Sequence, residues 1–502
     1  MRASGILMPI SSLPSAYGIG CFSKEAYEFA EACGKAGQTY WQILPLGPTG
    51  YGDSPYQSFS TFAGNPYFID LEELIGSGLL TKQECDSVDF GSDPEDIDYE
   101  KLYAGRKELL QLAYCRSNIA GDKAFLRFVK KNAYWLDDYA LYMAVKNHFG
   151  DVCWAEWDED IRLRDKKAML RYRELLADEI RFYQFQQYLF FTQWEKLKTY
   201  ANARGVKIVG DIPIYVAYDS ADAWANPKLF QFDRDCRPIK VAGCPPDAFA
   251  KTGQLWGNPL YDWPKHKKTG YAWWMKRMTM CFELYDVVRI DHFRGFDSYY
   301  AIPAGDTTAE FGSWEPGPGA ELFKTMREKL GEKAVIAEDL GFLTESVIEM
   351  VKESGFPSMK VLQFAFDSDA QNAYLPHHYH KNCVVYTGTH DNDTVVGWYQ
   401  GLNRKTKKHV KQYLNLTRAN DQTLTRAMIR CAMASVADMC IVPMQDYLCL
   451  GSQARINTPS TLGGNWCWRM QKGAFTEELI GEIRDLTALY ARAPVGDGKK
   501  ES

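Results

Sequence analysis

The chain has 502 residues and a formal net charge of −6 at pH 7, which is long for one ordinary domain but suits a large single domain with insertions. Acidic and basic residues are mixed without a basic stripe, and no apolar run approaches the ~18 to 20 residues that span a bilayer. The composition therefore gives no electrostatic case for nucleic acid or an anionic membrane, and we expect neither as a partner.

Cysteine usage points to a reducing compartment. Thirteen cysteines are scattered along the chain without Cys-x-x-Cys pairs or a metal-ligand spacing. An odd number in a chain of this size is typical of free thiols rather than of a disulfide framework. The apolar run at residues 6–10 is too short for a secretory signal core. We expect a cytoplasmic protein with no metal site and no cofactor.

Short apolar runs alternate with helical patterns along the chain, which predicts repeated strand-helix units and a parallel sheet. The helical patterns include residues 23–34, 322–330, 345–354 and 424–437. Eight runs are apolar enough to be strands buried on both faces, at residues 5–10, 39–44, 206–210, 287–290, 334–337, 359–364, 383–386 and 439–442. Eight such units predict an α/β fold, a closed (β/α)8 TIM barrel spanning residues 1–502.

Two connections are far longer than a strand-helix loop requires, so we interpret them as insertions. The first covers approximately residues 47–170, an ordered loop followed by a helical subdomain, and a long helical pattern at 172–204 then leads to the third strand. The second, approximately residues 219–274, is predicted to be a loop. Both follow the carboxyl ends of strands, so we expect inserted, mainly helical subdomains at the C-terminal face, where barrels carry their active sites.

The predicted strand at 287–290 brings charged side chains to its carboxyl end. Arg289 and Asp291 lie two residues apart, so they share one face of the strand. A guanidinium that close to a carboxylate favours the ionised form of the acid, which makes Asp291 a candidate nucleophile. The same pair taken alone could also be a structural ion pair.

Carboxylates follow three further predicted strands. Asp211 comes at the end of the third strand, Glu338 after the fifth and Asp391 after the seventh. Strand ends of a barrel converge on one rim, and like charges gathered there are costly unless function requires them. Any one of these acids could instead cap the next helix, and we expect that role for Asp339 and Asp393.

Glycosidic chemistry needs two carboxyl groups that flank the scissile bond. One attacks the anomeric carbon in its ionised form, and the other protonates the leaving oxygen. A rim with several carboxylates therefore indicates cleavage or transfer of a sugar.

The motifs at these strand ends occur in a distinctive order. They are Gly-Asp-Ile-Pro-Ile-Tyr-Val at 210–216, Arg-Ile-Asp-His-Phe-Arg-Gly at 289–295, Ala-Glu-Asp-Leu-Gly at 337–341 and Thr-Gly-Thr-His-Asp-Asn-Asp-Thr at 387–394. Gly-Asp-Ser-Pro-Tyr-Gln at 52–57, Pro-Pro-Asp at 245–247 and Gly-Gln-Leu-Trp-Gly-Asn-Pro at 253–259 accompany them. From Gly5 to about Arg469, the chain resembles the α-amylase clan and, more narrowly, the 4-α-glucanotransferases called amylomaltases or disproportionating enzymes.

This resemblance implies a role for each acid. Asp291 would be the nucleophile, Glu338 the general acid and base, and Asp391 the acid that holds sugar hydroxyls and stabilises the transition state. It also implies a set of substrate-binding residues, in which Arg289 tunes Asp291 and the two histidines bind one glucose: Arg289, His292, His390, Tyr56, Asp211, Asp247, Phe249 and Trp256.

The implied activity is that of a hexosyl-transferring enzyme. It would move a segment of an α-1,4-glucan to the 4-hydroxyl of an acceptor glucose or glucan, through a covalent glycosyl-aspartate and with retained configuration. Its partners would be maltooligosaccharides and α-1,4-glucans. A hydrolase of the same clan would use the same three carboxylates, and it is the alternative.

Two other classes of protein fit the sequence less well. A phosphate-binding barrel needs Gly-rich or basic ends at strands seven and eight, whereas strand seven ends in His390 and Asp391 and strand eight in Pro-Met-Gln-Asp at 443–446. A catalytically inactive glucan-binding barrel should lack one of the three carboxylates, and none is missing.

Overall fold

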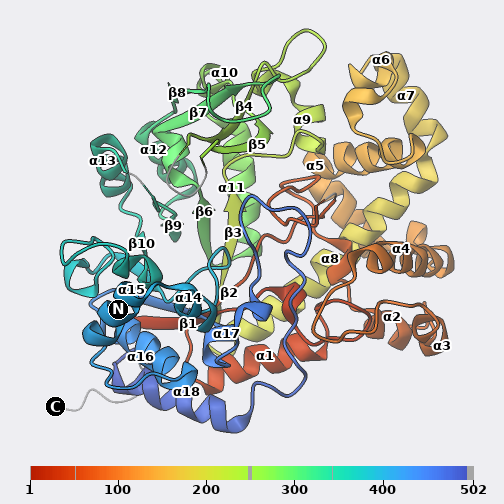
Figure 1. The fold of residues 1–502 in the computed structure, drawn as a ribbon. Coiled ribbons are helices and arrows are strands. Elements are labelled where there is room, and N and C mark those ends of the chain that lie inside the picture. Colours follow the sequence, from red (N-terminus) through yellow and green to blue (C-terminus); the bar gives the residue numbers. More distant parts are fainter. Residues whose placement is uncertain (1, 51, 247–250, 342, 495–502) are drawn as a thin grey trace.

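A computed structural model describes residues 2–50, 52–246, 251–341 and 343–494 (Figure 1). Eight strands form a parallel sheet in the order β10-β11-β12-β1-β2-β3-β6-β9. All eight predicted strands are confirmed, as β1 (Ala3–Leu7), β2 (Tyr40–Gln42), β3 (Lys207–Pro213), β6 (Val287–Asp291), β9 (Val335–Ala337), β10 (Ser358–Val361), β11 (Cys383–Tyr386) and β12 (Met439–Pro443).

The sheet curls into a nearly closed barrel. Its two outermost strands, β9 and β10, approach each other where the amide of Ala337 donates to the carbonyl oxygen of Pro357 at 3.0 Å. The strands are short apolar runs because both of their faces are buried. Packing is tight at Gly210 in β3, where an added Cβ would stand 2.1 Å from the ring of Tyr285. The residue before Asp211 therefore has to be glycine.

Helices alternate with the barrel strands along the chain, and the four predicted patterns are confirmed as α1 (Lys24–Lys35), α12 (Ala320–Leu330), α13 (Glu345–Ser354) and α16 (Asp421–Ala434). The others of this layer are α11 (Ala272–Leu284), α14 (Val395–Gly401), α15 (Arg404–Tyr413), α17 (Met444–Tyr447) and α18 (Glu477–Leu489). Within the described part of the chain, none of the helices combines the length and the apolar character that crossing a membrane requires.

Between β2 and β3 the chain builds a group of helices on one side of the barrel, at the right in Figure 1. They are α2 (Leu71–Gly76), α3 (Lys82–Asp86), α4 (Tyr99–Arg116), α5 (Lys123–His148), α6 (Glu159–Arg162), α7 (Lys166–Leu175) and α8 (Ala177–Asn202). The Nζ atom of Lys146 on α5 lies 2.6 Å from Oδ2 of Asp219, after β3. This nearly buried ammonium ties the helical group to the barrel.

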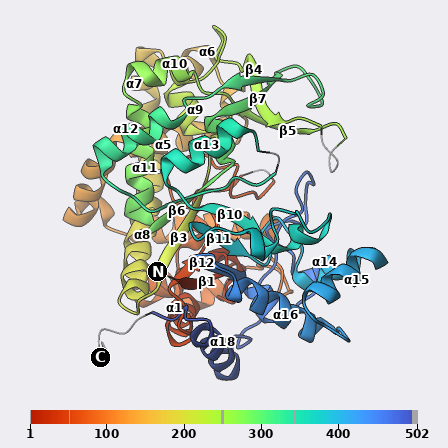
Figure 2. The ribbon, with the colours of Figure 1, turned by 90° about the vertical axis from the view of Figure 1, so that its left-hand side faces the viewer.

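A second sheet was not predicted. β4 (Lys240–Cys244), β5 (Gln254–Pro259), β7 (Ser298–Pro303) and β8 (Ser313–Pro316) pair antiparallel in the order β5-β4-β7-β8 (Figure 2). The stretch 219–274, predicted to be a loop, thus contains two strands, as well as α9 (Ala221–Ala225) and α10 (Trp263–Lys268). The prediction missed the sheet because β4 pairs with β7, which lies beyond β6 in the chain.

The second sheet reaches the carboxyl ends of the barrel strands. The ring of Trp256, on β5, meets the ring of His292 edge-on at a centroid distance of 4.8 Å. His292 directly follows β6. The unpredicted sheet therefore borders the rim where the carboxylates were expected.

At the other end of the barrel, Arg492 joins the last helix to the first strand. Its side chain is fully buried. It donates hydrogen bonds to the carbonyl oxygens of Met433 at 2.8 Å, Ala437 at 2.9 Å and Ala3 at 3.0 Å. One guanidinium thus satisfies carbonyl groups from α16, from the turn before β12 and from β1.

Replacing Arg492 should destabilise the fold without touching the rim. Arg492→Ala would leave several buried carbonyl oxygens without donors, and we expect a loss of about 3 kcal/mol in the free energy of unfolding. Urea unfolding followed by circular dichroism would measure it. The control is Arg426→Ala, which removes an exposed ion pair with Glu482 and should leave the midpoint unchanged. Equal midpoints for the two variants would contradict the role of Arg492.

Candidate active site

The carboxyl ends of the barrel strands open into a cleft of about 530 Å³, a volume in the range of ligand-binding sites. Four parts of the chain line it: the barrel strand ends, the loop at 52–57, the second sheet and the segment after β12. Its lining includes Tyr56, Trp256, Asp291, His292, His390, Asp391, Asn457 and Trp466.

Arg289 lies between two carboxylates at the floor of the cleft. Its Nη1 atom is 2.6 Å from Oδ2 of Asp211, and its Nη2 atom is 3.0 Å from Oδ1 of Asp291. Asp211 faces Arg289 because β3 and β6 pair in that register. The predicted shared face of Arg289 and Asp291 is thereby confirmed.

Burial raises the pKa of Asp291 to about 6. The guanidinium of Arg289 opposes this rise, and the neighbouring carboxylates Asp211 and Asp391 add to it. Asp291 is therefore ionised above pH 6 and has its side chain 29% exposed to the cleft. Such a group can attack an electrophilic carbon.

Glu338 follows β9, and its carboxyl group accepts hydrogen bonds from two backbone amides. Its Oε2 atom accepts the amide of His292 at 2.6 Å, and Oε1 accepts the amide of Leu340 at 2.8 Å. Burial, and then the charge of Asp291, raise its pKa to about 7, although Arg289 and the two amides act in the opposite direction. Glu338 therefore keeps its proton at a higher pH than a free glutamate does.

Asp391 has the opposite electrostatic environment. Burial would raise its pKa, but the charge and the hydrogen bond of His390, together with the hydrogen bond from Asn457, outweigh burial and hold the pKa well below its usual range. Its Oδ2 atom is 3.3 Å from Nε2 of His390, and its Oδ1 atom accepts from Nδ2 of Asn457 at 2.6 Å. Asp391 is thus a permanently ionised carboxylate.

Tyr56 links the ends of β3 and β11. Its hydroxyl lies 2.9 Å from Oδ2 of Asp211 and 2.9 Å from Nε2 of His390, and its ring stacks on the His390 ring. An ionised carboxylate can only accept, so the hydroxyl donates to Asp211 and accepts from the Nε2–H group of His390. Burial, with the charge of Asp211, raises the pKa of Tyr56 well above its usual value, which keeps this donor protonated.

Two histidine nitrogens remain available at the cleft. Neither Nε2 of His292 nor Nδ1 of His390 has a hydrogen-bond partner among the described residues. Burial, followed by the charge of Arg294, lowers the pKa of His292 to about 3, so its ring is neutral. For His390, burial acts to lower the pKa, but Asp391 outweighs it and the pKa is raised. Both rings can bind neutral hydroxyl groups.

Every predicted site residue that the structure describes lies in or beside this cleft, and Asp247 and Phe249 lie outside the described residues. The expected capping role of Asp339 and Asp393 is wrong. Asp339 accepts a hydrogen bond from the amide of Met359 on β10, and Asp393 accepts one from the hydroxyl of Ser452. The helices that follow begin later, with Thr344 and Thr394 at their N-cap positions, and the Thr394 side chain accepts a hydrogen bond from the amide of Gly397.

Sequence reasoning missed the segment after β12. It brings Arg455, Asn457 and Trp466 to the His390-Asp391 pair. None of the three belongs to a predicted strand or to a run of acidic residues. The available signal was only a long stretch without helical periodicity between β12 and α18.

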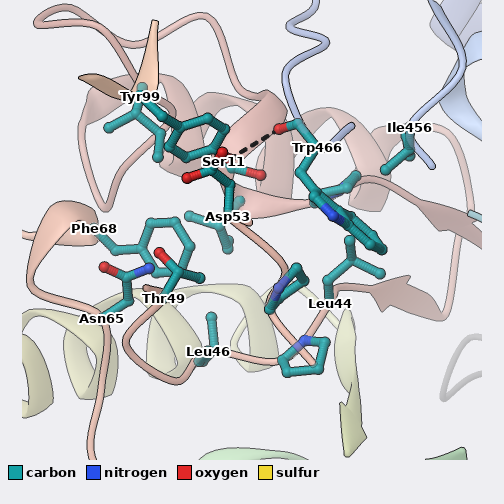
Figure 3. A pocket seen from close by; sticks show the side chains of 15 residues that line it. Ser11, Leu44, Leu46, Thr49, Asp53, Asn65, Phe68, Tyr99, Ile456 and Trp466 are labelled. Atoms are coloured by element: carbon teal, nitrogen blue, oxygen red, sulfur yellow. Dashed lines mark hydrogen bonds between the residues drawn. The ribbon is translucent and has the colours of Figure 1, made fainter. Parts of the chain in front are cut away.

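Figure 3 shows how distant segments meet at a small cavity beside the cleft, where Tyr99 of α4 faces Asp53 and Trp466. The hydroxyl of Tyr99 donates to the carbonyl oxygen of Trp466 at 2.9 Å. Tyr103, also on α4, donates to Oδ1 of Asp53 at 2.6 Å. The cavity measures about 20 Å³, enough for a water molecule but not for a sugar. This region is therefore packing that supports the loop of Tyr56.

No ligand set for a metal ion is apparent in the described parts of the chain, because no three His, Cys, Asp or Glu side chains gather as they would around one. The chemistry that the cleft offers comes from its carboxyl groups and from hydroxyl-binding groups around them.

Comparison with known proteins supports a family assignment. The family model described as 4-alpha-glucanotransferase matches residues 8–476. The 4-alpha-glucanotransferase of Clostridium butyricum is 50% identical over 487 residues, covering 97% of this chain and 100% of that protein. The one of Streptococcus pneumoniae serotype 4 is 51% identical over 494 residues, covering 98% and 97%.

A solved structure agrees with these relatives. The amylomaltase from Streptococcus agalactiae, in complex with acarbose, is 41% identical and has a TM-score of 0.95, covering 98% of this chain and 100% of that one. Since the family model spans most of the chain and the relatives are matched over nearly their whole length, the chain belongs to the 4-alpha-glucanotransferase family.

Proposed function

We propose that this cleft transfers a segment of an α-1,4-glucan by a retaining double displacement, with Asp291 as nucleophile, Glu338 as general acid and base, and Asp391 as the stabilising carboxylate. The observation that carries the proposal is the geometry of two carboxyl groups at the ends of the neighbouring strands β6 and β9: Asp291 lies 3.0 Å from the guanidinium of Arg289, and Glu338 lies on the amides of His292 and Leu340 with its pKa raised by burial and by the charge of Asp291. A carboxylate beside a cation, next to a carboxyl group that holds its proton, is the pattern of a nucleophile and an acid.

In the first step, ionised Asp291 attacks the anomeric carbon of the donor glucan. The bond from that carbon to the glycosidic oxygen breaks, and the proton of Glu338 moves to the leaving oxygen. The products are a glycosyl ester on Asp291 and a shortened glucan with a free 4-hydroxyl. Arg289, 3.0 Å from Asp291, keeps the carboxylate ionised before attack and oriented towards the cleft.

In the second step, Glu338 accepts the proton of the acceptor 4-hydroxyl while that oxygen attacks the anomeric carbon. The ester bond breaks and Asp291 leaves as a carboxylate. Two inversions give net retention. Positive charge develops at the sugar ring in both steps, and the ionised Asp391 opposes it.

As donors and acceptors we propose maltooligosaccharides and α-1,4-glucans. The free nitrogens of His292 and His390 suit hydroxyl groups, and aromatic rings such as Tyr56 and Trp256 can stack on pyranose faces. The solved amylomaltase described as a complex with acarbose supports an oligosaccharide ligand. Asp247 and Phe249 remain predicted contacts on the acceptor side.

For the division of the chain we propose one catalytic barrel over residues 1–502, with inserts at approximately 47–170 and 219–274. The first insert contributes Tyr56 and the second Trp256 to the cleft. We propose the cytoplasm as the site of action, because an odd number of cysteines scattered without paired spacing suits a reducing compartment.

Sugar rather than water is the second nucleophile in this proposal, and the family membership does not favour the hydrolase. An acceptor held beside the ester has an effective concentration far above that of a free solute. Trp256 lies against His292 and so next to the nucleophile, where its ring can hold the acceptor and displace water.

Asp291→Asn should abolish the first step. We expect the turnover of maltotriose to fall by about 10³-fold or more with the fold intact, because the amide cannot form the ester. Glucose release and circular dichroism would measure the two properties. The control is Asp297→Asn, a nearby acid that binds Ser298 and Ser346 outside the cleft. A folded Asp291→Asn enzyme with more than about a tenth of normal turnover would exclude this nucleophile.

The dependence of kcat/KM on pH should be bell-shaped. Activity is lost below about pH 6 as Asp291 gains a proton and above about pH 7 as Glu338 loses its acidic proton. With maltotriose, Glu338→Gln should lose about 10²- to 10⁴-fold. With a glucosyl fluoride, which needs no acid, the first step should survive and the alkaline limb should vanish. Equal losses on both substrates would assign the acid to another residue.

The enzyme should convert maltotriose into glucose and a ladder of longer maltooligosaccharides with little gain in reducing ends. Trp256→Ala should raise the ratio of hydrolysis to transfer several-fold, because water then reaches the ester. Chromatography with a reducing-end assay measures both. Trp314→Ala, on β8 at the opposite edge of the same sheet, is the control. A steady rise in reducing ends without longer products would favour the hydrolase.

A further inference from the structure

We propose that Asn457, set in place by Arg455, is the positioning residue that aims the carboxylate of Asp391 at the anomeric centre. The inference rests on the proposed role of Asp391. Both residues lie in the segment between β12 and α18, which the catalytic motifs do not include.

Three hydrogen bonds join this segment to the loop that carries His390 and Asp391, and a fourth braces the segment itself. Asn457 donates from Nδ2 to Oδ1 of Asp391 at 2.6 Å and from its amide to the carbonyl oxygen of His390 at 3.1 Å. Arg455 donates to the carbonyl oxygen of Asp391 at 2.8 Å and to that of Asn457 at 2.8 Å. The side chain and the backbone of Asp391 are therefore held by one clamp.

Asp391 needs such a clamp because its own strand does not fix it. β11 ends at Tyr386, and Asp391 comes five residues later in the connection to α14. Its side chain is 40% exposed to the cleft, and its other contact, with His390, is longer at 3.3 Å. The short bond from Asn457 is thus the contact that sets the direction of the carboxylate.

The chemical nature of the clamp suits a carboxylate that must keep its charge. An amide donates a hydrogen bond without adding a positive charge, so the negative charge of Asp391 stays available to oppose the charge on the sugar. The cation of the pair, Arg455, is directed to backbone carbonyl oxygens instead. Asp291 differs, since a guanidinium contacts its carboxylate directly.

The segment is itself firmly placed. Asn465 accepts the amide of Thr458 at 2.9 Å, and the amide of Trp466 donates to the carbonyl oxygen of Ile456 at 2.7 Å. Tyr99 binds the carbonyl oxygen of Trp466, as Figure 3 shows. Asn457 can therefore act as a fixed reference for Asp391.

Removing the amide should lower activity without changing the shape of the pH profile. The ionisable groups that face Asp391 are His390 from its own loop, Asp291 and Arg289 from β6, and Tyr56. Asn457→Ala leaves all of them in place, so any change reflects the lost donor. We expect kcat/KM on maltotriose to fall roughly 10- to 100-fold. The loss should be about the same from pH 5 to 8, because His390 still holds the pKa of Asp391 well below that window.

Asn457→Asp should instead lose activity in a pH-dependent way. The new carboxyl group has the shape of the amide and can donate to Asp391 only while it is protonated. We expect the loss of kcat/KM to grow as the pH rises and the two carboxylates repel each other. A loss that grows with pH in Asn457→Asp, beside a loss independent of pH in Asn457→Ala, cannot come from a damaged loop.

The decisive experiment measures kcat/KM from pH 5 to 8 for both variants, alone and combined with Asp391→Asn. If the clamp acts through Asp391, substituting Asn457 should cost little further activity in the Asp391→Asn background. The control Asn465→Ala loosens the same segment without touching Asp391 and should keep near-normal kcat/KM.

The outcomes separate the two proposals. An Asp391→Asn enzyme with near-normal activity would refute the proposed function of Asp391. An inactive Asp391→Asn enzyme beside a fully active Asn457→Ala enzyme would overturn only the positioning role. The same holds if Asn465→Ala reproduces the loss of Asn457→Ala, or if the two Asn457 variants lose activity in parallel at every pH. Should Asn457→Ala fail to fold, the isosteric Asn457→Asp still decides by its pH trend.

Discussion

A single buried guanidinium organises the candidate active site. Arg289 is almost fully buried and contacts both Asp211 and Asp291. A buried cation without partners would be strongly destabilising, so the register of β3 and β6, which sets Asp211 opposite Arg289, is also what makes the site possible. Asp211 in turn accepts a hydrogen bond from the hydroxyl of Tyr56, and the same hydroxyl is hydrogen-bonded to His390. The register of the barrel strands thus determines, through this chain of contacts, where His390 lies on the far side of the cleft.

One cation cannot neutralise every carboxyl group at this rim. Arg289 has contacts with two of them, and the charge of Asp291 then adds to burial in raising the pKa of Glu338. Burial, reinforced by this excess negative charge, raises the pKa of Glu338 and keeps its proton near neutrality. Like-charge crowding costs stability locally, and the site persists because rigid elements hold it. Glu338, for example, is fixed by backbone amides of His292 and Leu340.

The parts of this protein that sequence could predict are those with a local signal. Barrel strands are apolar runs, and acids at their carboxyl ends converge because barrel geometry requires it. The second sheet had no such signal, since β4 pairs with β7 across the intervening strand β6. Asn457 had no local signal either. It is a neutral residue in an irregular segment, and only its contact with Asp391 in the folded structure indicates a role. The prediction that Asp339 caps a helix was wrong because the next helix, α13, starts several residues after it.

The location of each residue suggests a division of labour between the barrel and its additions. Asp291 ends β6, Glu338 directly follows β9 and Asp391 lies in the connection after β11, whereas Tyr56, Trp256 and Asn457 come from other parts of the chain. Bond breaking depends on the carboxyl groups, of which the barrel strands place Asp291 and Glu338. The choice between sugar and water depends on groups beside the nucleophile, such as Trp256. Acceptor preference can therefore change through such additions while Asp291 and Glu338 stay where the barrel places them.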